Sequence, residues 1–156
     1  MGATQYGRKI SYELEKRLEA EGYRAKYLFI SGSRIPSIPE PKPIYHLPDE
    51  AFKRELGRFE GTPKEILENQ ELLDFFLPML RADFTMDETY YDKAGIVLHT
   101  PIAAFGGEKD GEADESAILE WGKYTDNDFN YRIFPGGHFY LRDCEDEVIS
   151  EVMRLL

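Results

Sequence analysis

Three short apolar runs, each followed by glycines, constrain the fold of this chain more than any other feature of its sequence. Residues 27–30, 101–105 and 131–134 are rich in aliphatic and aromatic side chains. Short, mostly apolar runs of this kind are typical of strands buried on both faces of a parallel sheet. Helical patterns lie between the runs and supply the crossovers that parallel strands need. The sequence therefore predicts an α/β fold with a parallel sheet, three recognisable strands and flanking helices.

A long insertion separates the first run from the second. Five prolines between residues 36 and 48 predict an extended loop, and helical periodicity follows it. We therefore divide the chain into a partial core, residues 1–35 and 95–156, and a helical insertion, residues 36–94. Because α/β proteins bind ligands at the carboxyl edge of the sheet, an insertion placed after a strand predicts a lid over that edge.

Three local features of the helices are also predicted. Asp49 and Asp143 each precede a helical pattern and are expected to cap its first turn. Pro78 lies inside a helical pattern and is expected to break or kink that helix.

Charge and cysteine content limit the partners of the chain. Nineteen basic against 30 acidic residues give a net charge of −11, whereas nucleic-acid binding needs a surplus of Lys and Arg. No apolar run reaches the roughly 18–20 residues that span a bilayer, and no signal-peptide pattern begins the sequence. One cysteine excludes an internal disulfide, and three single histidines lack metal-ligand spacing. We expect a cytoplasmic domain without a metal, a cofactor, a nucleic-acid partner or a membrane contact.

Two glycine-rich loops carry candidate catalytic residues. Asp110 follows Gly106-Gly107, and His138 follows Pro135-Gly136-Gly137. Because parallel strands end at the same edge of a sheet, the two side chains can lie close together. An aspartate that accepts a hydrogen bond from one imidazole nitrogen leaves the other nitrogen as a general base. Spacing alone leaves open the alternative of two ordinary turns with a surface aspartate and a surface histidine.

Further motifs occur in one order along nearly the whole chain. They are His46-Leu47-Pro48-Asp49, Gly61-Thr62-Pro63, Glu71-Leu72, residues 77–84 (LPMLRADF), Glu88-Thr89-Tyr90, Pro101-Ile102, Gly106-Gly107 with Asp110, and residues 134–139 (FPGGHF). In this order they resemble type II thioesterases, the α/β-hydrolase editing enzymes of nonribosomal peptide and polyketide synthesis.

This resemblance implies a Ser–Asp–His triad that hydrolyses stalled or wrongly primed acyl groups. The substrate is the thioester on the phosphopantetheine arm of an acyl- or peptidyl-carrier protein. By position, His138 is the general base and Asp110 orients it, with Glu108 and Asp114 as alternatives to Asp110. No cofactor is implied.

The residues of the predicted lid have two interpretations. Phe75, Phe76, Leu77, Met79 and Leu80 recur at helical spacing and are mostly core. Alternatively, part of this set, with Phe76 and Leu80 as our candidates, lines an acyl channel and binds substrate. Arg81 either forms an ion pair with Asp83 or contacts a carrier protein.

The sequence departs from the resemblance at the nucleophile. The family's serine lies in a Gly-His-Ser-Met-Gly-Ala elbow, and this sequence starts at Met1-Gly2-Ala3, directly after the position of that serine. Ser31 and Ser33 lack the Gly-x-Ser-x-Gly pattern. The N–H after the nucleophile donates to the oxyanion in such hydrolases, so Met1 takes that position. Removing the nucleophile of a comparable triad costs on the order of 10⁶ in turnover, so we expect this chain alone to be inactive. We also expect the edge of the first strand to be uncovered and to favour association.

Two other functions stay open. The chain could be a non-catalytic fragment or binding partner of a synthetase. It could instead be an esterase of another α/β-hydrolase branch, which would share Asp110 and His138 but not the lid residues 77–84.

The remaining candidate residues are interpreted as structural. His46 is expected to pack within the lid, and His99 to precede a strand without a catalytic role. Cys144 lies beside Asp143 and Glu145, and acidic neighbours raise the pKa of a thiol, so a nucleophilic role is not expected.

Overall fold

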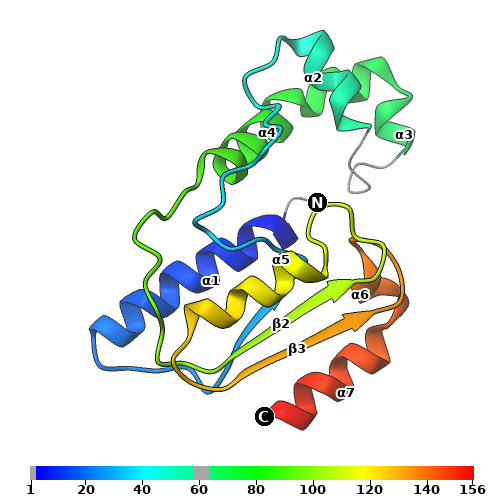
Figure 1. Cartoon of the computed structure of the whole chain (residues 1–156). Coiled ribbons are helices and arrows are strands. Elements are labelled where there is room, and N and C mark those ends of the chain that lie inside the picture. Colours follow the sequence, from blue (N-terminus) through cyan, green and yellow to red (C-terminus); the bar gives the residue numbers. More distant parts are fainter. Residues whose placement is uncertain (1–2, 58–63) are drawn as a thin grey trace. The chain divides into compact units, whose positions relative to one another are not determined.

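The computed structural model describes residues 3–57 and 64–156 and shows alternating helices and strands (Figure 1). In chain order the elements are α1 (Ala3–Ala20), β1 (Leu28–Ser31), α2 (Asp49–Leu56), α3 (Lys64–Leu67), α4 (Gln70–Thr89), β2 (Ile102–Gly107), α5 (Glu115–Leu119), the 3₁₀ helix η1 (Glu120–Tyr124), β3 (Phe129–Phe134), α6 (Tyr140–Asp143) and α7 (Glu145–Leu155). The three predicted strands are confirmed.

The chain forms two compact units. Residues 7–37 and 92–156 make the first, which we call the core unit, and residues 38–91 belong to the second, which we call the insertion unit. The division expected from the sequence, with residues 1–35 and 95–156 as a partial core and residues 36–94 as an insertion, stays a prediction. The role of the insertion unit as a lid stays a prediction.

The sheet of the core unit is parallel and has the order β1-β2-β3. Leu28 of β1 is in register with Ile102 of β2, and Ile102 is in register with Phe129 of β3. Every residue of the central strand β2 is buried. Within the described ranges, β1 pairs only with β2. Association through the other edge of β1 stays a prediction.

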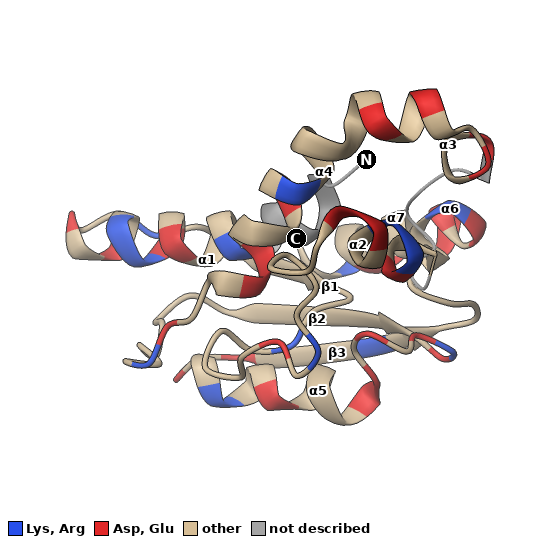
Figure 2. Cartoon of the chain, turned by 90° about the horizontal axis from the view of Figure 1, so that it is seen from above, with Lys and Arg blue, Asp and Glu red and all other residues tan. Residues whose placement is uncertain are grey.

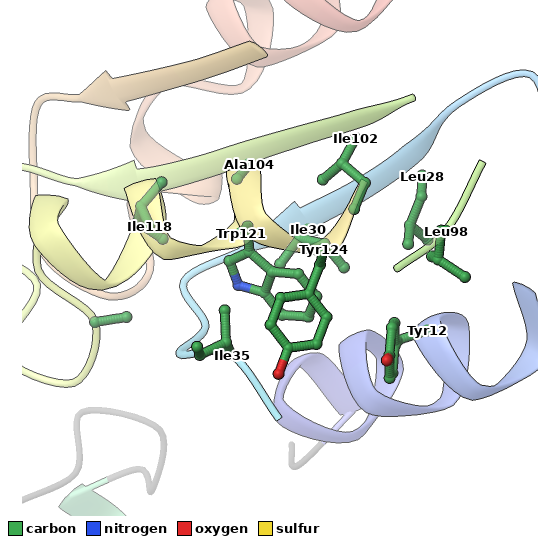
Figure 3. Packing of buried hydrophobic residues seen from close by; sticks show 11 residues of the cluster. Tyr12, Leu28, Ile30, Ile35, Leu98, Ile102, Ala104, Ile118, Trp121 and Tyr124 are labelled. Atoms are coloured by element: carbon green, nitrogen blue, oxygen red, sulfur yellow. The ribbon is translucent and has the colours of Figure 1, made fainter. Parts of the chain in front are cut away.

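One face of the sheet is covered by α1, α5 and η1. Tyr12, Trp121 and Tyr124 pack edge-on or tilted, with ring centroids 5.4–6.0 Å apart (Figure 3). The indole Nε1 of Trp121 donates to the carbonyl oxygen of Ser33 at 2.8 Å. This contact ties the loop after β1 to the helical layer, so that burial of the indole costs no unpaired donor.

The opposite face is covered by α6 and α7. Ala103 and Phe105 of β2 point to this side and form a cluster with Phe134, Tyr140 and Cys144. Their neighbours Ile102 and Ala104 belong to the cluster on the first face. This alternation is the period of two that a strand dictates. The core unit therefore has three layers, with helices on both faces of the sheet.

Charged residues lie mainly on the helices and connecting loops, and β1 and β2 carry none (Figure 2). α1 carries both acidic and basic residues (Figure 2). Among the residues that the structure describes, the helices are all too short or too polar to cross a bilayer.

The insertion unit has its own apolar core. Phe52 and Leu56 of α2 pack with Leu73, Leu77 and Leu80 of α4. Pro78 was expected to break or kink this helix. The expected break is wrong, because α4 is one element over 20 residues with Pro78 inside it. Proline removes a single backbone donor, and the buried leucines on both sides of it hold the helix together.

Both predicted aspartate caps were wrong. α2 begins at Asp49, its N-cap is Pro48, and no side chain caps it. Asp143 is the last residue of α6, a short helix that the sequence did not predict, and Cys144 is the N-cap of α7. In each case the N-cap of the helix lies one residue away from the predicted aspartate.

Of the two interpretations of Arg81, the ion pair with Asp83 is wrong, and contact with a carrier protein stays a prediction. Arg81 Nη2 instead lies 2.7 Å from Asp49 Oδ1. Its Nη1 donates to the carbonyl oxygens of Tyr45 and Leu47. One guanidinium therefore joins α4 to the segment that leads into α2.

Candidate active site

Asp110 and His138 meet at the carboxyl end of the sheet. Asp110 follows β2, His138 follows β3, and 2.9 Å separates His138 Nδ1 from Asp110 Oδ2. The side chain of Asp110 is fully buried, and that of His138 is 10% exposed. The sequence-based prediction that these two residues lie together is confirmed. The alternative of two separate surface side chains is thereby wrong.

Backbone hydrogen bonds hold the two loops against each other. Glu108 N–H donates to the carbonyl oxygen of Phe134, and Lys109 N–H donates to that of Gly136, both at 2.8 Å. A Cβ at Gly107 would lie 2.2 Å from the carbonyl oxygen of Gly137, closer than any side chain allows. Glycine at position 107 is therefore a condition for the approach of the loops, and thus of the two side chains.

The carboxylate of Asp110 is held at both oxygens. Oδ1 accepts hydrogen bonds from the backbone N–H groups of Glu112 and Ala113 at 2.8 and 3.2 Å, and Oδ2 faces the imidazole. Burial alone would raise the pKa of Asp110, but the hydrogen bond and charge of His138 and the two N–H groups lower it below its usual value. Asp110 is consequently an ionised acceptor at neutral pH.

An ionised Asp110 fixes the tautomer of His138. Because a carboxylate only accepts, Nδ1 must be the protonated nitrogen, and in the neutral imidazole Nε2 therefore carries the lone pair. This pair has the geometry of the aspartate and histidine of a hydrolase triad, in which Nε2 removes a proton from a nucleophile. The arrangement can therefore perform general base chemistry.

Ser31, the last residue of β1, and Ser33, two residues after it, make other contacts. Ser31 Oγ lies 2.6 Å from the hydroxyl oxygen of Tyr140, and Ser33 Oγ donates to the carbonyl oxygen of Arg34. Gly32 between them lies against the pair, since a Cβ there would be 3.2 Å from His138 Cε1. Sequence reasoning missed Gly32 and Tyr140 as neighbours of the site. The only available signal was that a third strand also ends in glycine.

The alternatives to Asp110 do not contact His138. Glu108 is exposed, and Asp114 caps α5 by accepting from the N–H of Ala117 at 2.9 Å. Met1, the predicted oxyanion position, lies outside the described residues.

The candidate substrate-binding residues Phe76 and Leu80 lie on α4. Leu80 is buried in the core of the insertion unit, and Phe76 is partly buried against that core. Phe75 contacts Phe76 edge-on and is 76% exposed, and Met79 is 51% exposed. The expectation that these residues are mostly core therefore fails for Phe75 and Met79. A substrate-binding role for Phe76 and Leu80 stays a prediction.

The other histidines are both exposed. His46 packs edge-on against Tyr45, with ring centroids 5.3 Å apart. His99 Nδ1 lies 2.8 Å from Asp126 Oδ2, in a pair whose side chains are more than half exposed. The surface pair His99–Asp126 thus resembles His138–Asp110 in its atoms but not in its burial.

Burial raises the pKa of the Cys144 thiol, and the charges of Glu147 and Asp143 raise it further. The predicted direction is confirmed for Asp143. Glu147, the third residue of α7, raises the thiol pKa instead of the expected Glu145.

Comparison with known proteins places the chain in a family. A family model described as "Thioesterase domain" matches residues 6–156. Thioesterase PikA5 of Streptomyces venezuelae is 35% identical over 94% of this chain and 52% of its own length. The gramicidin S biosynthesis protein GrsT of Aneurinibacillus migulanus is 36% identical over 96% of this chain and 59% of its own. The chain therefore spans between half and two thirds of the length of these relatives.

Solved structures agree with the sequence matches. YbtT, a type II thioesterase of a yersiniabactin pathway, superposes with a TM-score of 0.85 at 30% identity, over 95% of this chain and 61% of YbtT. RedJ, a thioesterase of the prodiginine pathway in Streptomyces coelicolor, gives a TM-score of 0.82 at 28% identity, over 96% of this chain and 57% of RedJ. The chain belongs to the thioesterase domain family and has the α/β-hydrolase architecture of its type II members.

Proposed function

We propose that this chain provides the general base and the orienting carboxylate of a type II thioesterase. The observation that carries the proposal is the buried Asp110–His138 pair at the carboxyl end of two neighbouring parallel strands. The proposed substrate is an acyl or peptidyl thioester on the phosphopantetheine arm of a carrier protein. The names of its relatives support this class, since YbtT belongs to a nonribosomal peptide and polyketide pathway and GrsT to gramicidin S biosynthesis.

In the proposed reaction, His138 Nε2 takes the proton from a serine hydroxyl as that oxygen attacks the thioester carbonyl. Asp110 stabilises the imidazolium, which then protonates the leaving thiolate. A water molecule, deprotonated by the same nitrogen, then attacks the acyl-serine. The imidazolium returns this proton to the departing serine oxygen, so that the acid is released and the free serine and neutral His138 are restored. The sequence contains no Gly-x-Ser-x-Gly pattern. We propose that the serine belongs to a segment placed before α1, with the N–H of Met1 as an oxyanion donor.

The test compares the chain alone with an extended protein. In the extended protein, Met1 is preceded by the strands and the Gly-His-Ser elbow that the resemblance to type II thioesterases implies. The assay substrate is an acetylated phosphopantetheinyl carrier protein. Its hydrolysis is measured from the thiol and the acetate that are released. We expect turnover by the extended protein only. His138→Ala should lower this turnover by roughly 10⁴-fold or more.

His99→Ala is the matched control, because it removes a histidine that also pairs with an aspartate, at 2.8 Å, but on the surface. It should leave turnover unchanged. Equal activity of His138→Ala and the extended parent would contradict the proposal. Faster hydrolysis of simple esters than of the carrier thioester would favour an esterase. A folded extended protein that binds carrier without turnover would favour a binding partner.

A further inference from the structure

A third strand end contacts the Asp110–His138 pair, and no step of the proposed reaction uses it. The hydroxyl oxygens of Ser31, the last residue of β1, and Tyr140, the first residue of α6, are 2.6 Å apart. Tyr140 lies two residues after His138, and Ser31 directly precedes Gly32. Because β2 lies between β1 and β3, this hydrogen bond joins segments on either side of the central strand.

Gly32 is the point at which β1 meets the pair. Its φ is +53°, a conformation that glycine adopts at little cost, and its N–H donates to the carbonyl oxygen of Phe105 at 2.8 Å. A Cβ at this position would lie 3.2 Å from His138 Cε1 and 3.3 Å from Asp110 Oδ2. Gly32 therefore lies close to both members of the pair and leaves room for only a hydrogen where another residue would carry a Cβ.

The hydroxyl of Tyr140 is held firmly by its surroundings. The ring is fully buried and stacks on Phe134, with centroids 5.3 Å apart and planes 7° from parallel. Burial raises the pKa of Tyr140 far above its usual value, the bond to Ser31 opposes this rise, and the charge of Asp110 adds to it. Tyr140 is thus a neutral, fixed partner for Ser31.

We propose that Ser31 and Tyr140 are positioning residues. Their hydrogen bond holds Gly32 against the imidazole, and this contact keeps His138 in the rotamer and the Nδ1–H tautomer that Asp110 accepts. The consequence for catalysis rests on the proposed function. The effect on the imidazole does not, because it is measured in the chain as it exists, without substrate or nucleophile.

The experiment is ¹⁵N NMR of the His138 imidazole in the parent and in Tyr140→Phe and Ser31→Ala. The readouts are the tautomer ratio and the rate at which the Nδ1–H proton exchanges with water. Loss of one ordinary hydrogen bond shifts a local opening equilibrium by about fivefold. We expect about fivefold faster exchange in both variants, with a detectable Nε2–H tautomer.

Tyr124→Phe is the matched control. Tyr124 is also a buried tyrosine of the core unit, and its hydroxyl donates to a serine, Ser37 Oγ, at 2.7 Å. This variant should lower the midpoint of urea unfolding about as much as Tyr140→Phe does, with no effect on His138. If Tyr140→Phe and Ser31→Ala leave both imidazole readouts at the parent values, the proposal is wrong, and the hydrogen bond contributes packing alone.

The extended protein separates this inference from the proposed function. If the extended parent is active, Ser31→Ala should lower kcat about fivefold with KM unchanged. If it is inactive while the imidazole readouts change as expected, the proposed function fails and the positioning role stands.

Discussion

Arg81 Nη2 lies 2.7 Å from Asp49 Oδ1, although 32 residues separate them in the sequence. The same guanidinium donates to the carbonyl oxygens of Tyr45 and Leu47, and its carbon lies 4.3 Å from the ring centroid of Phe52. A planar group with several donors suits such a site, because it can donate hydrogen bonds in two directions while its face stacks on an aromatic ring. Arg81 therefore organises the approach to α2 within the insertion unit.

Arg81→Lys should destabilise the insertion unit by about 1–3 kcal/mol. Lysine keeps the charge but cannot reproduce the fork, so at least one of the two carbonyl oxygens loses its donor. Urea unfolding measures the loss, and amide hydrogen exchange at residues 44–49 should locate it. Asp49→Ala is the comparison, because Asp49 is 65% exposed and its ion pair should be worth no more than about 1 kcal/mol. A larger loss for Asp49→Ala than for Arg81→Lys would contradict this assignment.

Glu88→Gln should stabilise the protein at neutral pH. Burial raises the pKa of Glu88, the N–H groups of Tyr45 and Ile44 oppose the rise, and the charges of Glu40 and Asp87 add to it. A raised pKa in the folded state means that ionisation costs stability as pH rises through 4.5 toward the folded value. Glutamine has no charge, and its amide oxygen can still accept from both N–H groups, which share one oxygen of Glu88.

The free energy of unfolding of Glu88→Gln and its parent, measured from pH 3 to 7, tests this sign. The two curves should converge in acid, where Glu88 is protonated, and separate in favour of the variant as pH rises. A variant less stable than the parent at pH 7 would show that the charge itself is needed by the two N–H groups.

The strands of the core unit could be predicted because their sequences have one interpretation. A run such as residues 101–105 is too short for a helix and too apolar for a loop, and its glycine ending marks a turn. Loops that leave parallel strands must begin at one edge, so the meeting of Asp110 and His138 followed from topology. Spacing of 28 residues fits one helix and one strand between them.

The partners of individual side chains could not be predicted in the same way. Asp83 is closer to Arg81 in sequence than Asp49 is, but two residues along a helix point to different faces. Ser31 and Tyr140 are 109 residues apart, and only the three-dimensional packing of α6 brings their hydroxyls together. Contacts between distant residues depend on rotamers and on helix placement, which no local pattern encodes.

Asp110→Asn should lower stability at pH 7 by about 1–3 kcal/mol, because a charge-assisted hydrogen bond to His138 becomes neutral or is lost. The pKa of Asp110 lies below its usual value of 3.8, so the stabilisation is fully present above that pH and is lost as pH falls through the folded value. The difference between parent and variant, from urea unfolding at several pH values, should therefore shrink below pH 3.8. A difference that grows in acid would reverse the sign of this argument.

Cys144 should react slowly with iodoacetamide in the folded protein. Burial raises the pKa of its thiol, with added repulsion from Glu147 and Asp143, and the Sγ donates to the carbonyl oxygen of Pro135 at 3.4 Å. At pH 8.5 we expect alkylation at least about tenfold slower than in 6 M urea, since both thiolate fraction and access fall.

Two charge variants on α7 separate electrostatics from burial at Cys144. Glu147→Gln removes a charge that raises the thiol pKa and should accelerate alkylation of the folded protein. Glu145 is adjacent to Cys144 in the sequence but is not among the charges that shift the thiol pKa. Glu145→Gln should therefore leave the alkylation rate unchanged. Equal acceleration by both variants would mean that the net charge of the helix, rather than the position of Glu147, controls the thiol. Rates measured at low ionic strength give the largest contrast, because salt screens exposed charges.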